Sequence, residues 1–503
     1  MLGASIYSNR GIWSIAAFLL CAAVAARAFG QASPSKPGQT DSKQSQSPTS
    51  SGVTGPATLK DLSAAIDEII NQPRYLSAKW GIEVTGLDSG KVIYEHNSRA
   101  LLVPASNAKL FTAALALDRL GPDFKIQTSV YSGSNPDRRG VVKGDVIVYG
   151  RGDPTFAAGA DQYPYAPLEG LASELEKSGV RRISGDLIGD DSYFRGAPFG
   201  SGWEWNDLQW YYGAEVSALS INDNAIRLEV TPGPRPGAQC RIETEPDGPL
   251  ITLINTTNTA PAGSPRTLGV YRPIGENTIY VWGSLPAGDP GYASFVAIHN
   301  PALMFVTMLK EVLARHGITV TGKVGVIDWK YRMRAPIQFS RLTKLAEVSS
   351  PPVSEIVKET LKPSQNLYAQ LLLLQAGLSP SAPASAKTSS GNDQSNTAQP
   401  IVDSTGMSQT AEESGLSALK LFLSKAGVGP GEAFIEEGAG LSRSDLVTPD
   451  AVVKLLSYVS KQGYARVLND ALPIAGADGT LRNRMKQTSA AGKVKAKTGS
   501  LHY

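Results

Sequence analysis

Apolar residues recur at helical spacing in several parts of the chain, between recognisable start and stop signals. From Ser106 onward they fall three or four residues apart, and Gly121 supplies a stop. This pattern predicts a helix whose first turn carries Ser106. The same spacing predicts further helices over 59–70 after the capping residue Thr58, over 301–315, from 351 onward, over 416–425 and over 449–461.

Alternation of apolar and polar residues predicts strands elsewhere. Residues 80–94 alternate on both sides of the turn Asp88-Ser89-Gly90, which predicts a β-hairpin just before the Ser106 helix. A long region after that helix is rich in Gly, Pro and Asp. It contains short β-like runs such as 141–149 and 227–231, so we predict one or two inserted β-rich domains there.

Three segments differ in composition from the rest of the chain. Arg10 precedes an apolar run that ends near Ala26-Arg27-Ala28, which predicts a signal peptide over 1–28; an uncleaved membrane anchor is the alternative. Residues 29–57 are rich in Ser, Pro, Gln and Thr and predict a disordered linker. Residues 379–400 predict a low-complexity surface loop, because neither segment has the apolar residues that offset the entropy of ordering.

Composition narrows the possible partners. The chain has 503 residues, enough for two or three domains, and its net charge of +3 gives no reason to expect nucleic acid. Cys240 is the only cysteine beyond the predicted signal peptide, so an exported chain has no internal disulfide. The acidic clusters at 189–194 and 202–207 lack the ligand register of an EF-hand, and we interpret them as turns.

Ser106 and Lys109 are the first candidates for chemistry. Three residues apart on one helical turn, they face each other. A serine hydroxyl is a poor nucleophile without a base, and a lysine serves as that base only if burial or a second cation lowers its pKa. The helix N-terminus also offers backbone N–H groups where an oxyanion would develop. Alone, Ser-x-x-Lys is a short pattern that arises often by chance.

Two further short motifs follow in the chain. Ser364-x-Asn366 precedes an apolar helical stretch, and Lys497-Thr498-Gly499 lies in a final run, 493–501, that alternates like a strand. A solvated basic edge strand is the alternative interpretation of that run. The chain has only four histidines, none in a nucleophile-elbow context, so a Ser-His-Asp triad is the poorer account of a reactive serine.

The three motifs in this order resemble those of penicillin-recognising serine enzymes. With the long insertion after the first motif, the chain resembles the class C low-molecular-mass penicillin-binding proteins, the D-alanyl-D-alanine carboxypeptidase/endopeptidase family S13. Longer stretches support the resemblance: Gly202 to Asn224, Gly440-Leu441-Ser442-Arg443, Leu446 to Pro449 and Leu472 to Leu481.

The resemblance implies an α+β fold. We expect a penicillin-binding-protein/β-lactamase-like transpeptidase domain, with an antiparallel sheet flanked by helices, over 58–125 and 335–503. The inserted β-rich domain or domains occupy 126–334. Family members continue past the last motif with further strands and a closing helix, so for a sequence stopping at Tyr503 we expect these to be missing.

The resemblance also implies residue roles. Ser106 attacks the D-Ala-D-Ala carbonyl, Lys109 takes its proton, and Lys497 lowers the pKa of Lys109. Asn366 holds the acylated peptide's amide and orients Lys109, while Ser364 relays a proton to the departing D-alanine. Remaining roles fall to the last motif: Lys497 and Thr498 bind the terminal carboxylate, Gly499 belongs to the same motif, and the Ser500 and Ser106 N–H groups form the oxyanion hole.

Two carried-over roles have equally good structural alternatives. Asp190 is expected to bind the free amino group of a diaminopimelate side chain, or else is a turn aspartate. Arg443 is expected to approach a peptide carboxylate, or else is a surface arginine.

The implied activity is hydrolysis of peptidoglycan pentapeptides and cross-linked muropeptides in the periplasm, with inhibition by β-lactam antibiotics. No cofactor or metal is implied, and a homodimer is allowed. The alternatives are a β-lactamase or esterase of the same fold, and a non-catalytic cell-wall-binding protein if the C-terminal elements are missing.

Overall fold

A computed structural model of the protein describes residues 58–158, 163–379 and 409–501. The predicted signal peptide, the linker and nearly all of the low-complexity loop lie outside the described residues. Among the helices within those ranges, none has both the length and the apolar character needed to cross a bilayer.

The centre of one half of the molecule is a bundle of helices around α7 (Asn366–Leu378), which is buried over almost its whole length. A helix that is apolar on all sides must be surrounded by others. Gly377 permits close packing on α8, because a Cβ there would lie 2.4 Å from the Gly415 nitrogen. The surrounding helices are α2 (Lys109–Arg119), α6 (Val353–Leu361), α8 (Ala411–Lys425), α9 (Pro449–Val459) and α10 (Ala465–Ala471).

The N-terminal elements follow the predicted pattern. Helix α1 (Leu59–Ile70) begins with a capping box between Thr58 and Asp61. Strands β1 (Ile82–Thr85) and β2 (Val92–His96) form the predicted antiparallel hairpin. Helix α8 begins at Ala411, five residues before the predicted start at 416, because Thr410 caps it together with Glu413.

The inserted region contains a five-stranded sheet covered by helices α3 (Glu169–Lys177) and α4 (Pro301–Arg315). Helix α4 is the helix predicted over 301–315, whereas α3 has no counterpart among the predicted helices. Strand β16 is paired with β3, so the inserted unit runs past the predicted boundary at 334. The sheet order is β15 (Val324–Ile327), β7 (Leu187–Asp190), β5 (Val146–Tyr149), β3 (Gln127–Ser132) and β16 (Thr343–Ser349).

Smaller elements complete this half and the bundle. A three-stranded sheet has the order β14 (Thr319–Val320), β6 (Arg182–Ile183) and β4 (Val141–Val142), and the short pair β17 (Ala433–Phe434) and β18 (Leu446–Val447) lies near the bundle. The remaining helical segments are α5 (Trp329–Arg334), η1 (Pro73–Tyr75), η3 (Ala166–Leu168), η4 (Tyr211–Gly213), η5 (Asn222–Asn224) and η6 (Phe339–Arg341).

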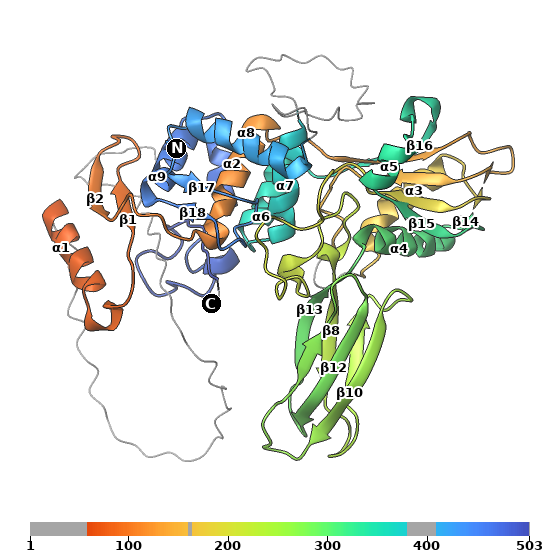
Figure 1. Ribbon diagram of the computed structural model, residues 1–503, viewed down its shortest axis with the longest axis horizontal. Coiled ribbons are helices and arrows are strands. Elements are labelled where there is room, and N and C mark those ends of the chain that lie inside the picture. The colour runs from red at the N-terminus through yellow and green to blue at the C-terminus, as the bar shows by residue number, and fades with distance from the viewer. Residues whose placement is uncertain (1–57, 159–162, 380–408, 502–503) are drawn as a thin grey trace.

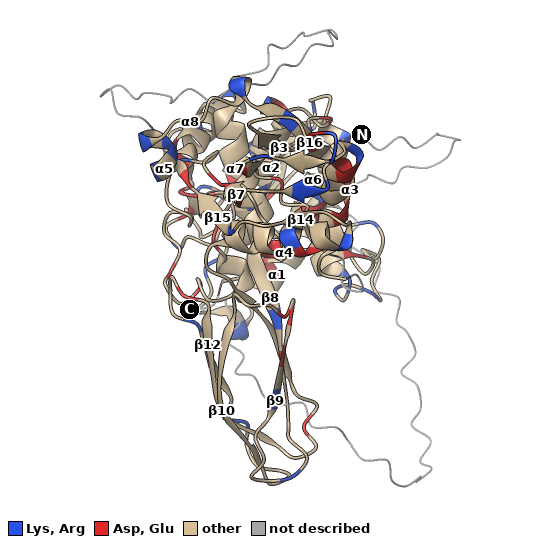
Figure 2. Ribbon diagram, turned by 90° about the vertical axis from the view of Figure 1, so that its right-hand side faces the viewer, with Lys and Arg blue, Asp and Glu red and all other residues tan. Residues whose placement is uncertain are grey.

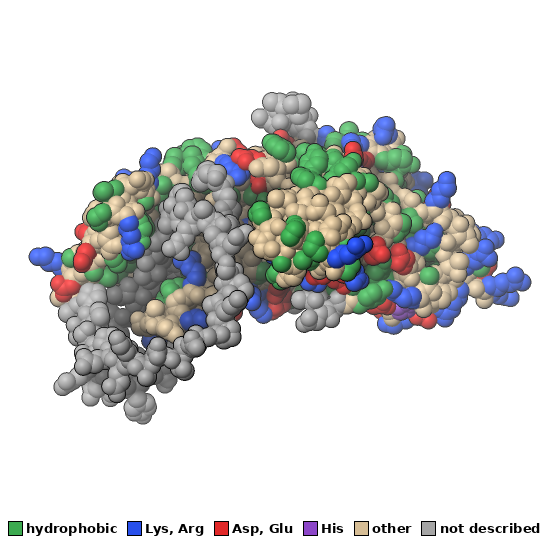
Figure 3. Space-filling model, turned by 90° about the horizontal axis from the view of Figure 1, so that it is seen from below, with side chains coloured by type: hydrophobic (Ala, Val, Ile, Leu, Met, Phe, Trp, Pro, Cys, Tyr) green, Lys and Arg blue, Asp and Glu red, His purple; other side chains and the backbone are tan. Residues whose placement is uncertain are grey.

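A second inserted unit projects from the molecule as two long, facing sheets (Figure 1). Strands β10 and β12 carry no charged residue along their length (Figure 2), and uncharged side chains dominate this end of the molecule seen from below (Figure 3). One sheet has the order β10 (Thr252–Ala260), β12 (Thr278–Pro286) and β11 (Gly269–Tyr271); the other has β13 (Tyr292–Ala297), β8 (Ala225–Thr231) and β9 (Arg241–Glu245).

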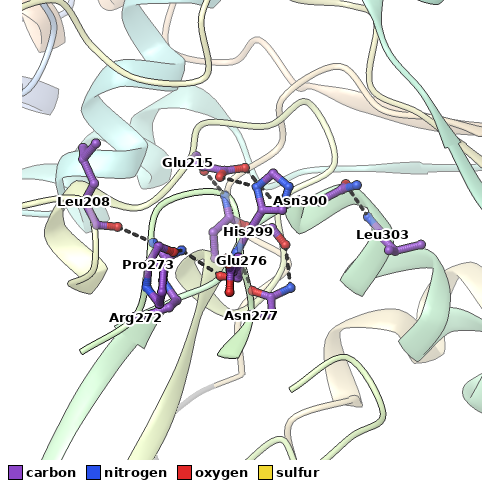
Figure 4. A network of polar contacts seen from close by, with 10 residues as sticks. Leu208, Glu215, Arg272, Pro273, Glu276, Asn277, His299, Asn300 and Leu303 are labelled. Carbon is purple, nitrogen blue, oxygen red and sulfur yellow. Dashed lines mark hydrogen bonds and ion pairs between the residues drawn. The ribbon is translucent and has the colours of Figure 1, made fainter. Parts of the chain in front are cut away.

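A polar network fixes the base of this projecting unit (Figure 4). The Glu215 carboxylate accepts the Asn300 N–H at 2.9 Å and lies 2.7 Å from His299 Nδ1. Arg272 donates to the Leu208 carbonyl at 2.6 Å. Because Leu208 and Glu215 flank η4, these bonds attach the projecting unit to the loop that reaches the helical bundle.

Candidate active site

Ser106 lies in the 3-10 turn η2 (Ala105–Ala108), directly before α2. Ala105 has a φ of 47°, a conformation that L-residues seldom adopt, and it turns the chain sharply into the helix. The Lys109 side chain lies beside the serine, with Nζ 2.8 Å from Ser106 Oγ. The three-residue spacing thus brings the two groups together, as predicted.

Lys109 is completely buried and has three hydrogen-bond partners. Its Nζ lies 2.8 Å from Ser106 Oγ, 2.6 Å from Asn366 Oδ1 and 2.6 Å from the Ala439 carbonyl oxygen. Burial lowers the pKa of Lys109 to about 7, against the opposing effect of the Glu437 and Asp445 carboxylates. Near neutral pH, the Lys109 amine is therefore uncharged in a large fraction of the molecules.

The three partners define how a neutral Lys109 amine must be oriented. The Asn366 and Ala439 oxygens can only accept hydrogen bonds, so they take the two N–H groups of the amine. The remaining lone pair points to Ser106, whose O–H then donates to nitrogen. This is the arrangement that a general base requires.

The second motif lies at the start of α7. Ser364 adopts a φ of 71°, and its hydroxyl accepts a hydrogen bond from Lys497 Nζ at 2.7 Å. Asn366 donates from Nδ2 to the Tyr212 carbonyl at 2.8 Å, which orients its Oδ1 toward Lys109. Tyr212 comes from the inserted region, so a contact with the insert helps to hold the asparagine in place.

The third motif closes the cluster from the C-terminal side. Burial, and then repulsion from Lys109, lower the pKa of Lys497 well below its usual value. The expected repulsion between the two amines therefore acts on Lys497, whereas the pKa of Lys109 is lowered by burial. Since Lys497 is 8% exposed, the alternative of a solvated basic strand is wrong at this position.

Gly499 and Thr498 fit tightly into the same cluster. A Cβ on Gly499 would lie 2.6 Å from the Pro104 carbonyl oxygen and 3.0 Å from the Ser106 nitrogen, so only glycine allows this approach. The Thr498 hydroxyl lies 2.8 Å from that of Thr480 in the 3-10 turn η7 (Gly479–Leu481).

The predicted strand over 493–501 is not formed. Lys495 makes a single antiparallel bridge with Ile474. The neighbouring backbone bonds run to the loop at 473–475: the Ala496 N–H donates to the Pro473 carbonyl at 3.0 Å. An irregular partner of this kind cannot support a continuous ladder.

Sequence reasoning missed the part played by the loop 437–442. The fully buried Glu437 carboxylate accepts the N–H groups of Ala439 and Leu441, each at 2.7 Å. Gly440 has a φ of 76°, and a Cβ there would lie 2.0 Å from the Ala105 carbonyl oxygen. An acidic residue followed by glycine-rich sequence, Glu437-Gly438-Ala439-Gly440, was the available signal.

Asp190 and Arg443 have ionic partners outside the motif cluster. Asp190 is completely buried at the end of β7, where it accepts the Ser192 N–H and pairs with Arg332. Arg443 pairs with Glu204 at 3.0 Å and with Asp207 at 3.5 Å. Neither contact is with Ser106 or Lys109, and the roles of Asp190 and Arg443 toward the substrate stay predictions.

The remaining ionisable candidates form no second site among the described residues. Within these ranges, no group of three or more His, Cys, Asp or Glu side chains is arranged to hold a metal ion. His299 and His316 pair with glutamates of the inserted region. Cys240 is free and buried.

The fold and the motif cluster place the chain among the penicillin-recognising serine enzymes. The sequence matches the D-Ala-D-Ala carboxypeptidase 3 (S13) family over residues 62–417 and 390–503. This chain therefore belongs to that family, and the resemblance and the α+β fold predicted from the sequence are confirmed.

Individual relatives agree with this assignment. The chain is 33% identical over 466 residues to a D-alanyl-D-alanine carboxypeptidase of Actinomadura sp. strain R39, covering 90% of this chain and 79% of the relative. It is 27% identical to the D-alanyl-D-alanine carboxypeptidase DacB of Haemophilus influenzae, over 84% and 80% of the two chains. The crystal structure of penicillin-binding protein 4 from that organism superposes with a TM-score of 0.68 and 26% identity over 84% of each chain.

Proposed function

We propose that this serine peptidase is a D-Ala-D-Ala carboxypeptidase and endopeptidase that cleaves peptidoglycan stem peptides through an acyl-enzyme at Ser106. The observation that carries the proposal is the orientation of Lys109: two oxygens that can only accept occupy its N–H groups, which leaves the lone pair for the Ser106 hydroxyl. The named relatives are D-alanyl-D-alanine carboxypeptidases, which supports the choice of substrate.

Acylation follows from this geometry. Ser106 Oγ bonds to the carbonyl carbon of the penultimate D-alanine as its proton passes to Lys109. The N–H groups of Ser106 and Ser500 bind the oxyanion of the tetrahedral intermediate. When the C–N bond breaks, the departing amine takes a proton from the Ser364 hydroxyl, which recovers one from the Lys497 amine 2.7 Å away. The proton that Lys109 took from Ser106 then replaces the one that Lys497 gave up, so Lys109 is again a neutral base for the second step.

The substrate carboxylate binds at the third motif. Lys497 and Thr498 provide a cation and a hydroxyl, a combination that forms strong hydrogen bonds to an anion. The approaching carboxylate also offsets the unfavourable burial of the Lys497 charge. Water then attacks the ester carbonyl, with Lys109 as base, and releases the shortened peptide from Ser106.

The same serine accounts for inhibition by penicillin. Attack on the β-lactam carbonyl opens the ring, and the leaving nitrogen stays tethered to the acyl group. The crystal structure of the Haemophilus influenzae relative in complex with a β-lactam, superposed with a TM-score of 0.62, supports a shared β-lactam site.

Labelling tests the proposal directly. Incubation with a labelled penicillin followed by peptide mapping is expected to place one adduct on Ser106. Ser106→Ala is expected to abolish the label, whereas Ser424→Ala, at an exposed serine of α8, retains it. Label on another residue of the parent enzyme contradicts the proposal.

Two assays separate the alternatives. Rapid turnover of a chromogenic β-lactam indicates a β-lactamase, whereas a long-lived adduct together with release of D-alanine indicates the carboxypeptidase. Muropeptide binding that survives Ser106→Ala, without hydrolysis by the parent, indicates a wall-binding protein. The rate of hydrolysis of cross-linked muropeptides, compared with the rate of D-alanine release, measures how much of the activity is endopeptidase activity.

We also propose that residues 1–28 direct export to the periplasm, where these substrates occur. Cell fractionation tests this location, and sedimentation of the purified protein distinguishes a monomer from a homodimer.

A further inference from the structure

Glu437 closes the loop that supplies one of the acceptors of Lys109. Its carboxylate is completely buried, and its two oxygens accept the N–H groups of Ala439 and Leu441, each at 2.7 Å. These bonds bracket the peptide unit between Ala439 and Gly440. The carbonyl of that unit accepts the Lys109 Nζ at 2.6 Å, so the carboxylate determines where this acceptor lies.

Neighbouring contacts hold the loop against the start of α2. Gly440 packs so closely on Ala105 that no side chain fits there. Thr112, one turn after Lys109, donates its hydroxyl to the Gly438 carbonyl at 2.8 Å. The loop and the helix are thus joined at two points on either side of the Ala439 contact, and a shift of the loop would move the Ala439 carbonyl relative to Lys109.

Carboxylates outnumber cations around Glu437. The other carboxylates near it are Asp445 and Glu436 from the same stretch and Glu412 from α8, and the facing cation is Lys109. Burial and the Glu437 charge raise the pKa of Asp445, so this carboxyl holds its proton more readily than usual. Of the carboxylates that raise the pKa of Lys109, Glu437 has the larger effect and Asp445 the smaller, and burial leaves the interaction unscreened.

We propose that Glu437 is a positioning residue for acylation, holding the Ala439 carbonyl on the Lys109 amine and stabilising the ammonium that forms when Ser106 loses its proton. This role rests on the acylation of Ser106 proposed above. Because Glu437 is completely buried, the substrate does not reach it, and Glu437 acts through Lys109. The carboxylate thus does for the lysine what an aspartate does for the histidine of a Ser-His-Asp triad.

Glu437→Gln tests the role of the charge. An amide has one acceptor oxygen, so it cannot accept both loop N–H groups, and its NH2 faces one of them. Acylation by a penicillin is expected to slow about 10-fold at its plateau. The acidic limb of the rate is expected to move down by about one pH unit, because Lys109 loses the anion that raises its pKa.

Glu437→Asp separates geometry from charge. It keeps the carboxylate but shortens the side chain by one methylene, so the bonds to Ala439 and Leu441 lengthen. The plateau rate is expected to fall at least about 5-fold while the acidic limb stays at the parent pH. A merely structural residue would slow both variants without moving the limb of either.

Glu436→Gln is the matched control. Glu436 is the neighbouring carboxylate, and it accepts the Ser442 hydroxyl at 3.1 Å without bonding the Ala439 peptide. Its pH profile is expected to match that of the parent. Thermal melting establishes whether each variant is folded. If Glu437→Gln does not fold, the plateau acylation rate of Glu437→Asp tests the role of Glu437.

The outcomes distinguish this role from the function on which it rests. A parent enzyme that is not acylated on Ser106 overturns the proposed function. A parent that is acylated there, together with a folded Glu437→Gln that has the parent's rate and pH profile, overturns the role of Glu437 alone. A parent-like plateau rate in folded Glu437→Asp also overturns it.

Discussion

The inserted sheet and the motif cluster hold cations largely away from solvent in opposite ways. In the inserted sheet, Arg332 pairs directly with the buried Asp190 carboxylate. In the motif cluster, Lys109 and Lys497 lie buried near each other, and their direct hydrogen-bond partners are hydroxyl, amide and carbonyl oxygens. A carboxylate in direct contact keeps a buried cation charged, whereas neutral acceptors let an amine give up its proton.

The difference also lies in the type of cation. A guanidinium does not lose its proton in proteins, so Arg332 serves as a fixed charge. An amine changes protonation readily when it is buried. Reactivity therefore belongs to the region in which a titratable cation is left without a directly bonded anion.

The largest effect is expected when the titratable Lys109 of the motif cluster is replaced by a permanently charged arginine. Lys109→Arg places a cation that cannot act as a base beside Ser106, and acylation by penicillin is expected to slow by at least about 10³-fold. The rate is measured with a labelled penicillin, after a thermal melt has established that the variant is folded. An acylation rate within a few-fold of the parent would show that Lys109 is not the base.

Asp190→Asn makes the converse change in the inserted sheet. It leaves the Arg332 charge buried without its carboxylate, and unfolding is expected to be easier by about 3–5 kcal/mol. Denaturant titration measures the loss. Acylation per folded molecule is expected to match the parent, since neither residue is in contact with the motif cluster.

Asp190→Asn also decides between the two interpretations of this aspartate. If Asp190 binds the amino group of a diaminopimelate side chain, the variant raises KM for peptides that carry this group but not for N-acetylated ones. An equal KM for both peptides, with reduced stability, supports the structural interpretation.

The pH profile is expected to report the uncharged state of Lys109. Because burial lowers the pKa of this lysine to about 7, acylation is expected to rise with pH up to that point and then to level off. Well below it, the rate falls about tenfold per pH unit, since only the unprotonated amine accepts the Ser106 proton. A profile that is flat from pH 5 to 9 would contradict this assignment.

Local spacing in the sequence predicts the contact between Ser106 and Lys109, but it does not predict the irregular segments around them. Helical spacing alone places Ser106 beside Lys109, because both lie on one turn. The role of Glu437 was out of reach, since its contacts depend on how the loop 437–442 folds against α2. Alternation predicted a strand over 493–501, but the partner of this segment is an irregular loop that no local pattern indicates.

The smallest expected effect concerns the binding of the substrate's terminal carboxylate at Thr498. Thr498→Val removes the hydroxyl that we assign to the substrate's terminal carboxylate, and a hydrogen bond to a charged group contributes about 1.5–3 kcal/mol. KM for a D-Ala-D-Ala peptide is expected to rise about tenfold, with kcat less affected.

Thr480→Val is the matched control for Thr498. The two hydroxyls lie 2.8 Å apart, so the change at Thr480 removes a neighbour that orients Thr498 but leaves the proposed carboxylate ligand in place. A rise in KM of about threefold or less is expected. A peptide amidated at its C-terminus presents no carboxylate, and its KM is expected to be the same for Thr498→Val and the parent; an equal loss for both peptides would place Thr498 in the packing of the cluster.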